Sequence, residues 1–370
     1  MSTGAEPTPL RQSALREAHL ALGAKMAEFG GWEMPLEYAG VVAEHTAVRT
    51  SVGVFDVSHL GTVLVTGSGA ADHLNGRLTN DLGRIGPGQA QYTLCCDESG
   101  GVVDDLIAYM RTPDDLLLVP NASNSGEVVE RIAAGAPDGV EVRDVHEEYA
   151  VLAVQGPRCD EVLAHLGLPV GHDYMSFVET TFDGADVVVC RTGYTGERGY
   201  ELVVHPAEAA GAIWDALVDT SAPTPAVPCG LGARDTLRTE MGYPLHGQDL
   251  GPTITPVQAG SGWAVGWDKP SFPGREALVA EKAQGRTRAL RGLLAAGRGI
   301  PRPGMAVHLD GEQIGETTSG TFSPTLKQGI ALALLRTDVP VGAEVEVDVR
   351  GRLQPFVVTK PPFVPSSVRA

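Results

Sequence analysis

Short runs of Val and Leu bounded by Gly, Pro or Asp are the feature that most constrains the fold of this chain. They recur along most of its 370 residues and have the length and composition of strands. The runs predicted to be strands are 61–66, 116–119, 149–154, 185–191, 200–204 and 343–349. β-structure therefore dominates the prediction.

Helical periodicity separates these runs. The predicted helices are 10–23, 127–134, 207–218 and 233–241. One stripe of the third helix carries Ala210, Ile213, Trp214 and Leu217. Helices and strands follow one another without a regular βαβ order, which favours an α+β fold over a doubly wound sheet.

The charged segment 280–288 has the composition of a helix, and the chain after it consists of short strands and Gly/Pro turns. That pattern predicts a compact β-barrel. We therefore expect two domains, one over 10–278 and a barrel over 286–369.

Composition limits the class of partner and the compartment. A formal net charge of −18 argues against a general attraction to nucleic acid or to an anionic membrane. The five cysteines are scattered without a CxxC pair, which is typical of reduced thiols, and Cys95 and Cys96 are expected to be packing residues on opposite faces of a strand. No run approaches the length of a membrane helix, and 1–9 has the composition of a frayed leader. We expect a soluble, cytoplasmic protein.

Two segments rich in Gly, Ser and Thr, 230–235 and 318–326, have the composition of a tight turn or a helix entry beside a site. Neither is a phosphate loop. The chain has no GxxxxGK[ST] or HExxH motif, and 67–72 lacks the last glycine of a dinucleotide fingerprint. The sequence thus gives no support for a nucleotide or zinc site.

Paired carboxylates in the segment 100–106, Gly-Gly-Val-Val-Asp-Asp-Leu, are the first candidates for chemistry. The glycines permit a tight turn and the valines begin a strand, so Asp104 and Asp105 are predicted to face opposite sides. One carboxylate would be solvated, and the inward one would need donors or a cation, which is typical of a functional site. The alternative is that both only cap the turn.

Two arginines, Arg234 and Arg238, lie four residues apart on the helix predicted at 233–241. Like charges at that spacing repel, so an anionic partner is expected. That partner would be either a bound ligand or a carboxylate of the chain, such as Glu201 or Asp235.

Aromatic residues make up only 5% of the chain, so those beside motif residues stand out. They are Tyr92, Tyr174, Tyr194, Tyr243 and Trp263. Aromatic walls with a few polar groups suit a flat, polar-edged ring such as a pterin. Packing in the core is the alternative role for each of them.

Several motifs occur together in the order and at the separations of one known family. They are the segments 23–26, 30–35, 55–59, 100–106, 191–197, 230–235 and 318–326. From about Leu15 to Arg369 the chain resembles the aminomethyltransferase of the glycine cleavage system, the T-protein family. The resemblance implies an α+β fold with a two-lobed folate-binding region of mixed and antiparallel sheets around a central cavity, followed by a C-terminal β-barrel.

The same resemblance implies roles for individual residues. It places Asp105 against the folate as the catalytic carboxylate, and Arg234 with Glu201 in the substrate cavity. The further pocket residues that it implies are Tyr92, Asn121, Tyr194, Tyr243 and Trp263. No metal is expected.

The reaction implied is the transfer of a one-carbon unit from the aminomethyl group on the dihydrolipoyl arm of a lipoylated H-protein to tetrahydrofolate, with release of ammonia. Tetrahydrofolate would be the co-substrate, and the H-protein would supply the lipoyl group. A tetrahydrofolate-dependent O-demethylating methyltransferase of the same fold is the alternative.

The chain departs from the family at three positions. Leu60, Thr239 and His246 stand where Met, Leu and Tyr are common, and we expect them to affect substrate detail more than reaction class. His59, in the Phe-Asp-Val-Ser-His motif, is expected to order its loop rather than to act as a base.

Overall fold

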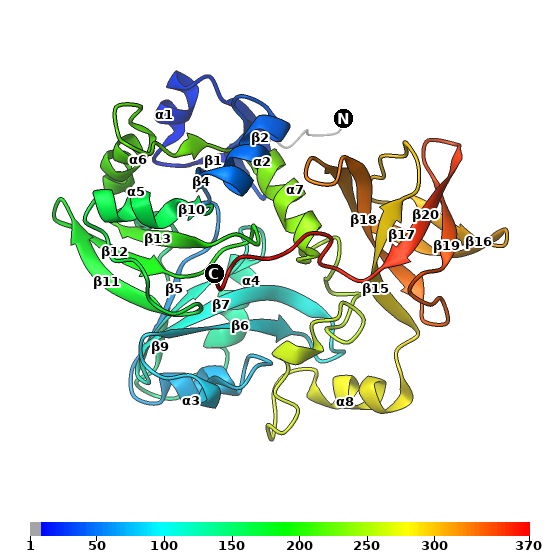
Figure 1. Cartoon of the computed structure of the whole chain (residues 1–370). Helices are drawn as coiled ribbons and strands as arrows, with labels where there is room; N and C mark the ends of the chain where they lie inside the picture. Colours follow the sequence, from blue (N-terminus) through cyan, green and yellow to red (C-terminus); the bar gives the residue numbers. More distant parts are fainter. Residues whose placement is uncertain (1–8) are drawn as a thin grey trace, which may run out of the picture.

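The computed structural model describes residues 9–370, which form three open β-sheets and a closed barrel (Figure 1). Of the leader predicted at 1–9, only Pro9 belongs to the described residues. The α-helices are α1 Arg16–Ala21, α2 Val41–Thr50, α3 Ala70–Asn75, α4 Ser125–Ala133, α5 Cys159–His165, α6 Ala210–Val218, α7 Leu231–Met241 and α8 Arg275–Gln284. Short 3-10 helices are η1 Leu82–Arg84, η2 His146–Glu148, η3 Ala207–Ala209 and η4 Gly262–Ala264. None of the helices within 9–370 is long and apolar enough to cross a membrane.

The first lobe is a six-stranded sheet at the left of Figure 1, where β10 to β13 are green and β4 is blue. Its strands in order are β11 Phe177–Phe182, β12 Ala185–Cys190, β13 Gly199–His205, β10 Ala150–Gln155, β4 Gly53–Asp56 and β14 Val227–Pro228. The apolar stripe predicted on α6 is confirmed, because Ala210, Ile213, Trp214 and Leu217 are all fully buried in the core that covers this sheet. Most neighbours pair antiparallel, which confirms the α+β class.

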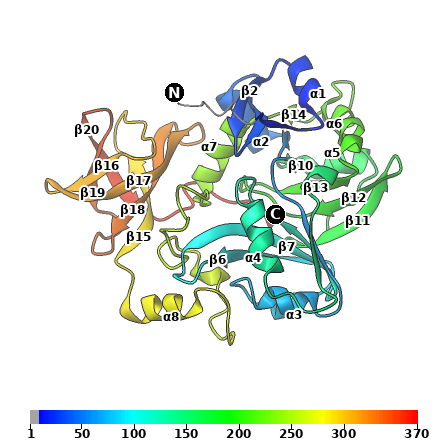
Figure 2. The ribbon, with the colours of Figure 1, turned by 180° about the vertical axis from the view of Figure 1, so that it is seen from behind.

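The second lobe is a five-stranded sheet. Its order is β6 Gln89–Cys96, β7 Val102–Thr112, β8 Asp115–Val119, β5 Val63–Thr66 and β9 Glu141–Asp144. Seen from behind in Figure 2, α3 and α4 lie over one side of it. Cys95 and Cys96 face opposite sides of β6 and pack into different apolar clusters, as predicted. Burial raises the pKa of the Cys95 thiol to about 12, so it stays protonated.

A small third sheet corrects the helix predicted at 10–23. Its strands are β1 Arg11–Gln12, β3 Trp32–Glu37 and β2 Lys25–Phe29, and only Arg16–Ala21 is helical. The chain stays extended before the helix because β1 pairs with β3 and the Ser13 hydroxyl donates to the buried Asp56 carboxylate. Tertiary contacts here override the local helical pattern.

The barrel contains the strands β15 Arg288–Ala295, β18 Gln328–Arg336, β17 Glu312–Ser323, β16 Ala306–Leu309, β19 Glu344–Asp348 and β20 Leu353–Thr359. The closed barrel predicted after residue 286 is therefore present. The segment 318–326, predicted as a turn, is strand β17 as far as Ser323 and turns only after it. Its small hydroxyl residues fit the narrow contact with α7 instead. The limits 10–278 and 286–369 stay a prediction, and Leu278 of α8 packs in one cluster with Leu334 of the barrel.

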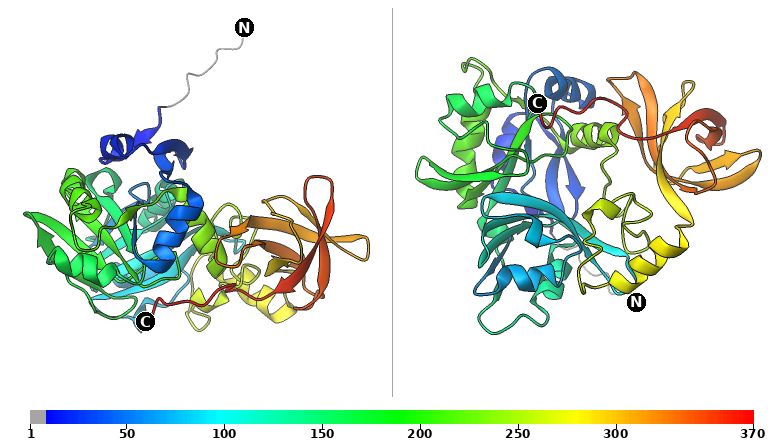
Figure 3. Two further views of the ribbon diagram at one scale, coloured as in Figure 1. Left: turned by 45° about the horizontal axis from the view of Figure 1, so that its top comes forward. Right: turned by 60° about the horizontal axis from the view of Figure 1, so that its bottom comes forward.

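Helix α7 lies between the two lobes and the barrel (Figure 3). It contacts α2, β3, β17 and β18. The last part of the chain, residues 361–369, leaves the barrel and runs back across the lobes, in red in Figure 1. We call this segment the strap. Its Phe363 N–H donates to the Glu240 carbonyl of α7 (2.8 Å), and its Ser367 N–H donates to the Gly196 carbonyl of the first lobe (2.8 Å).

Candidate active site

The two adjacent carboxylates lie in β7, directly after a tight turn. Gly100 adopts φ +86° there, and the Asp97 carboxylate accepts hydrogen bonds from two backbone N–H groups of the turn (2.8 and 3.0 Å). The alternative in which Asp104 and Asp105 cap this turn is therefore wrong, because Asp97 caps it. Both carboxylates are free to serve another purpose.

Asp105 is partly buried and receives only neutral donors. The Tyr92 hydroxyl of β6 donates to its Oδ2 (3.0 Å), and Asn121 Nδ2 donates to its Oδ1 (3.0 Å). Burial raises the pKa of Asp105 above its ordinary value, while the hydrogen bond from Tyr92 acts in the opposite direction. A carboxylate held by neutral donors keeps its charge available for a bound ligand.

Asp104 corrects the prediction that one member of the pair is solvated. Its side chain is 0% exposed, and it accepts hydrogen bonds from Asn121 N (2.9 Å), Asn121 Nδ2 (2.9 Å) and Asn124 Nδ2 (2.7 Å). The segment after β8 folds over the strand and supplies donors to both carboxylates, which strand alternation alone does not reveal. Burial, followed by the charge of Asp105, raises the pKa of Asp104 to about 8.

His246 extends this network. Its Nε2 lies 2.9 Å from the Val102 carbonyl, and its Nδ1 lies 2.9 Å from Asn124 Nδ2. Because a carbonyl oxygen only accepts, Nε2 carries the hydrogen and Nδ1 accepts from Asn124. This departure from the family pattern therefore lies one side chain away from Asp104.

One aromatic wall stands beside Asp105. The rings of Tyr92 and Trp263 are stacked, with centroids 5.2 Å apart and an interplanar angle of 27°. Trp263 belongs to η4 and is 66% exposed, so the core-packing alternative does not describe it. Its ring presents a flat apolar face beside a carboxylate.

Lys269 holds the segment that carries Trp263, and sequence reasoning did not find it. Its buried Nζ donates to the carbonyls of Leu78 (2.6 Å) and Asn80 (2.9 Å). Burial lowers its pKa to about 8. A single lysine between Asp268 and Pro270 gives no periodic signal, and only its placement shows that it fastens two loops together.

A second aromatic pair lies at the other side of the site. Tyr194 and Tyr243 have centroids 5.8 Å apart, and the Arg234 guanidinium lies over the Tyr194 ring at 4.9 Å from its centroid. The Tyr194 hydroxyl donates to the Pro244 carbonyl (2.5 Å). After burial, the charge of Asp105 is among the causes that raise the pKa of Tyr194, so the two parts of the site share one electrostatic environment.

Arg234 and Arg238 differ in their partners. Arg238 is buried and pairs with Asp249 (2.6 Å) and Asp235 (2.7 Å), so the anionic partner expected for the two arginines belongs to the chain in this case. Arg234 Nη1 is buried and has no hydrogen-bond partner among the described atoms. Burial lowers the pKa of Arg234, and the charge of Glu201 acts against that. Arg234 therefore retains donors for a ligand.

Glu201 lies on β13 and is 9% exposed. Its carboxylate accepts a hydrogen bond from the Thr192 hydroxyl (2.6 Å), and the Thr192 hydroxyl lies 3.0 Å from that of Tyr109. Glu201 acts on Arg234 through its charge rather than through a direct ion pair. The structure thus places the eight predicted site residues in two groups, and the charge of Asp105 acts on Tyr194 between them. The first group is Tyr92, Asp105, Asn121 and Trp263, and the second is Tyr194, Glu201, Arg234 and Tyr243.

Tyr174 and His59 take other roles. Tyr174 lies under the Arg369 guanidinium of the strap, at 5.1 Å from the ring centroid. His59 packs edge-on against Phe29, and burial lowers its pKa to about 3. A histidine with so low a pKa is a weak base, and its role in ordering the loop stays an expectation from sequence.

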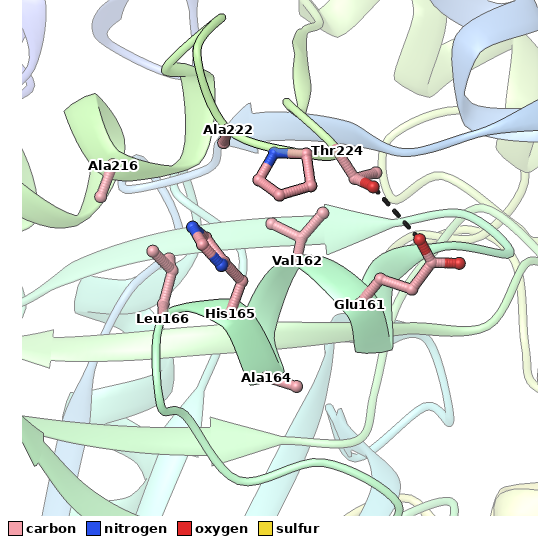
Figure 4. A pocket seen from close by; sticks show the side chains of 9 residues that line it. Glu161, Val162, Ala164, His165, Leu166, Ala216, Ala222 and Thr224 are labelled. Carbon is pink, nitrogen blue, oxygen red and sulfur yellow. Dashed lines mark hydrogen bonds between the residues drawn. The ribbon is translucent and has the colours of Figure 1, made fainter.

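A separate surface pocket lies away from these residues (Figure 4). Residues of α5, α6 and the loop after α6 line it, and the Thr224 hydroxyl donates to Glu161 there (3.1 Å). None of the predicted site residues belongs to its lining. Within residues 9–370, no group of three or more His, Cys, Asp or Glu side chains is arranged to hold a metal ion.

The fold and the site define a class of protein. The family model described as the GCVT N-terminal domain matches residues 15–269, and that of the glycine cleavage T-protein C-terminal barrel domain matches residues 288–365. The chain belongs to the glycine cleavage T-protein family.

Individual relatives agree with this assignment. The chain is 63% identical to an aminomethyltransferase of Parafrankia sp. over 97% of its own length and 99% of the relative. It is 59% identical to one of Mycolicibacterium paratuberculosis, with 97% and 98% covered. The crystal structure of the glycine cleavage system aminomethyltransferase T from Bartonella henselae superposes with a TM-score of 0.90 at 34% identity, with 97% and 99% covered.

Proposed function

We propose that this chain is a tetrahydrofolate-dependent aminomethyltransferase. It transfers the one-carbon unit of the S-aminomethyldihydrolipoyl group of a lipoylated H-protein to tetrahydrofolate. The carbon–sulfur and carbon–nitrogen bonds of the aminomethyl group break, bonds to N5 and N10 of the folate form, and ammonia and the dihydrolipoyl thiol leave. The observation that supports this most strongly is the identity of 63% to an aminomethyltransferase across nearly the whole of both chains.

Asp105 is the proposed catalytic carboxylate. Its charge is held by Tyr92 and Asn121 without a cationic partner, so it stabilises the positive charge that develops on nitrogen during the transfer. Since thiolate and ammonia must both depart from one carbon, correct positioning of the two substrates supplies much of the rate.

The remaining predicted residues would form the folate pocket. Tyr92 with Trp263, and Tyr194 with Tyr243, offer two stacked aromatic pairs for a flat ring. Asn121 and Glu201 offer a hydrogen-bonding amide and a carboxylate, and Arg234 offers guanidinium donors that no described atom occupies.

A coupled assay tests the proposal. Lipoylated H-protein carrying the aminomethyl adduct is mixed with the chain and tetrahydrofolate, and methylenetetrahydrofolate and ammonia are measured. Stoichiometric formation of both is the expected result. Activity on an aryl methyl ether with tetrahydrofolate, and none on the H-protein adduct, would instead establish the O-demethylating alternative.

A further inference from the structure

The hydrogen bonds around Asp104 and Asp105 bind the two carboxylates into one unit. Asn121 Nδ2 donates to an oxygen of each, at 2.9 Å for Asp104 and 3.0 Å for Asp105. Two carboxylates that share one donor lie within the range at which like charges interact strongly. Asp104 is the more deeply buried of the two.

The surroundings of this pair offer no positive charge to balance two negative ones. In the part of the chain that the structure describes, all hydrogen-bond donors to the pair come from neutral groups of Tyr92, Asn121 and Asn124. The neighbouring His246 has both ring nitrogens occupied in its neutral form, by the Val102 carbonyl and by Asn124. The other titratable neighbours do not add a cation either, because Cys95 faces Asp104 as a thiol and Tyr194 is a neutral phenol near Asp105.

We propose that Asp104 and Asp105 hold one proton between them at neutral pH, with the proton on Asp104, so that Asp104 sets the charge of the site at −1. Asp104 is then a positioning residue that acts through Asp105 and Asn121 rather than on the substrate. Full ionisation of both would place two charges in a region that only neutral dipoles solvate, which is costly. The related pattern in which two close carboxylates retain one proton is known from other enzymes.

The direction of the pKa shifts agrees with this arrangement. Burial and then the charge of Asp105 raise the pKa of Asp104 to about 8, against the donors from Asn124 and Asn121. The folded-state pKa thus lies above the ordinary value of 3.8. The stability contributed by this proton is fully present below the unfolded pKa and is lost as the pH rises through about 8.

The inference deepens the proposed function, on which it rests for its meaning in catalysis, but its test needs no substrate. Infrared difference spectra between pH 6 and pH 9 would be recorded on the full chain. We expect a protonated carboxyl band that disappears with a midpoint near pH 8. The band should be absent in Asp104→Asn and retained in Asp186→Asn, a matched control on an exposed position of β12.

Two further variants should move the midpoint in opposite directions. Asp105→Asn removes the neighbouring charge that holds the proton, so the midpoint should fall by a unit or more. Asn124→Ala removes a donor to Asp104, so the midpoint should rise. A purely structural role for Asp104 predicts no such pair of opposite shifts.

Thermal unfolding gives an independent readout. Between pH 6 and pH 9 the melting temperature of the wild type should fall more than that of Asp104→Asn. Only the wild type must release a proton from a buried carboxyl. The proposal is overturned if the wild-type spectra contain no carboxyl that titrates between pH 6 and pH 9. It is also overturned if the band survives in Asp104→Asn. Since the first of these outcomes needs only the wild type, a variant that fails to fold does not remove the test.

Discussion

Carboxylates are buried in two regions of this molecule, and the two regions treat them differently. At the contact of α7 with the barrel, Glu240 lies 2.9 Å from His45 Nε2 and 2.8 Å from Arg49 Nη2. Asp249 lies 2.6 Å from Arg238 at the same contact. In β7, by contrast, Asp104 and Asp105 receive only neutral donors.

Two arginines of helix α7, one turn apart, show the same contrast between a paired and an unpaired charge. Arg238 faces the barrel and is paired by two carboxylates, whereas Arg234 faces the lobes and lies over Tyr194 with an unoccupied Nη1. Charges balanced within the chain hold the barrel in place. Charges left without a counter-charge mark the place where a ligand is expected to supply it.

We expect the largest effect on stability at the contact of α7 with the barrel, where the buried charges are paired. Glu240→Gln removes the buried carboxylate that His45 and Arg49 share, while Arg49 keeps Glu197. Breaking a buried ion pair costs about 3–5 kcal/mol of unfolding free energy. Burial acts to raise the pKa of Glu240, but hydrogen bonds from His45 and Ser323 and the charge of His45 lower it to about 2. Its stabilisation is thus present above the unfolded pKa and is lost as the pH falls through 2.

Denaturant unfolding at several pH values checks this prediction. The wild type should lose stability between pH 5 and pH 2 more steeply than Glu240→Gln. Glu179→Gln, which removes an exposed partner of Arg111, should cost less than about 1 kcal/mol. Equal costs for the two variants would mean that the contact with the barrel is not held by this carboxylate.

Asp105→Asn should separate function from stability. It removes the charge at nearly constant volume, so turnover should fall by about two orders of magnitude or more, the scale of losing one preorganised electrostatic group. Unfolding free energy should stay within about 1 kcal/mol, since no ion pair is broken. The measurements are kcat in the coupled assay and denaturant unfolding, with Asp186→Asn as the control. A variant that is active but unstable would show that Asp105 stabilises the fold, as Glu240 and Asp249 do, and is not needed for catalysis.

Arg234→Lys should reduce turnover by roughly tenfold to a hundredfold, because one charge-assisted hydrogen bond contributes about 1.5–3 kcal/mol and an ammonium cannot reproduce the guanidinium fork. Arg336→Lys, at an exposed pair with Glu312, is the matched control and should leave the rate unchanged. Steady-state kinetics with both substrates measures the effect. Full activity of Arg234→Lys would show that the free guanidinium serves packing alone.

Trp263→Ala should have the smallest effect on the chain itself. The side chain is 66% exposed, so we expect a stability change within about 0.5 kcal/mol. If only the folded chain binds tetrahydrofolate, a concentration of a hundred times the dissociation constant raises the free energy of unfolding by about 2.7 kcal/mol. At a fixed folate concentration, the melting-temperature shift should be smaller in Trp263→Ala than in the wild type or in Leu353→Ala, an exposed barrel control. An unchanged shift would remove Trp263 from the folate pocket.

Much of the fold followed from local patterns. The stripe of α6 and the opposite faces of Cys95 and Cys96 were predicted correctly because periodicity alone determines them. The helix predicted at 10–23 is present only over Arg16–Ala21, because pairing with β3 and the contact of Ser13 with Asp56 come from residues distant in the chain. The turn predicted over 318–326 is present only after Ser323, because the small residues before it belong to a strand that contacts α7.

The motifs named the candidate site residues, and their role in binding or catalysis stays a prediction. The electrostatics of the site could not be predicted from them. They did not show that Asp104 is buried, that Asn124 and His246 adjoin it, or that Lys269 fastens the Trp263 segment. Each of these depends on how a loop lies over a strand, and no periodicity in the sequence encodes that.

The strap has a mechanical consequence. It runs from the barrel to the first lobe. Hydrogen bonds fix it at two points, from Phe363 to Glu240 of α7 and from Ser367 to Gly196 of the first lobe. A barrel that swung away from α7 would have to peel the strap from the first lobe at the same time. The two movements are therefore coupled. The barrel should unfold together with the lobes in one cooperative step rather than as an independent domain.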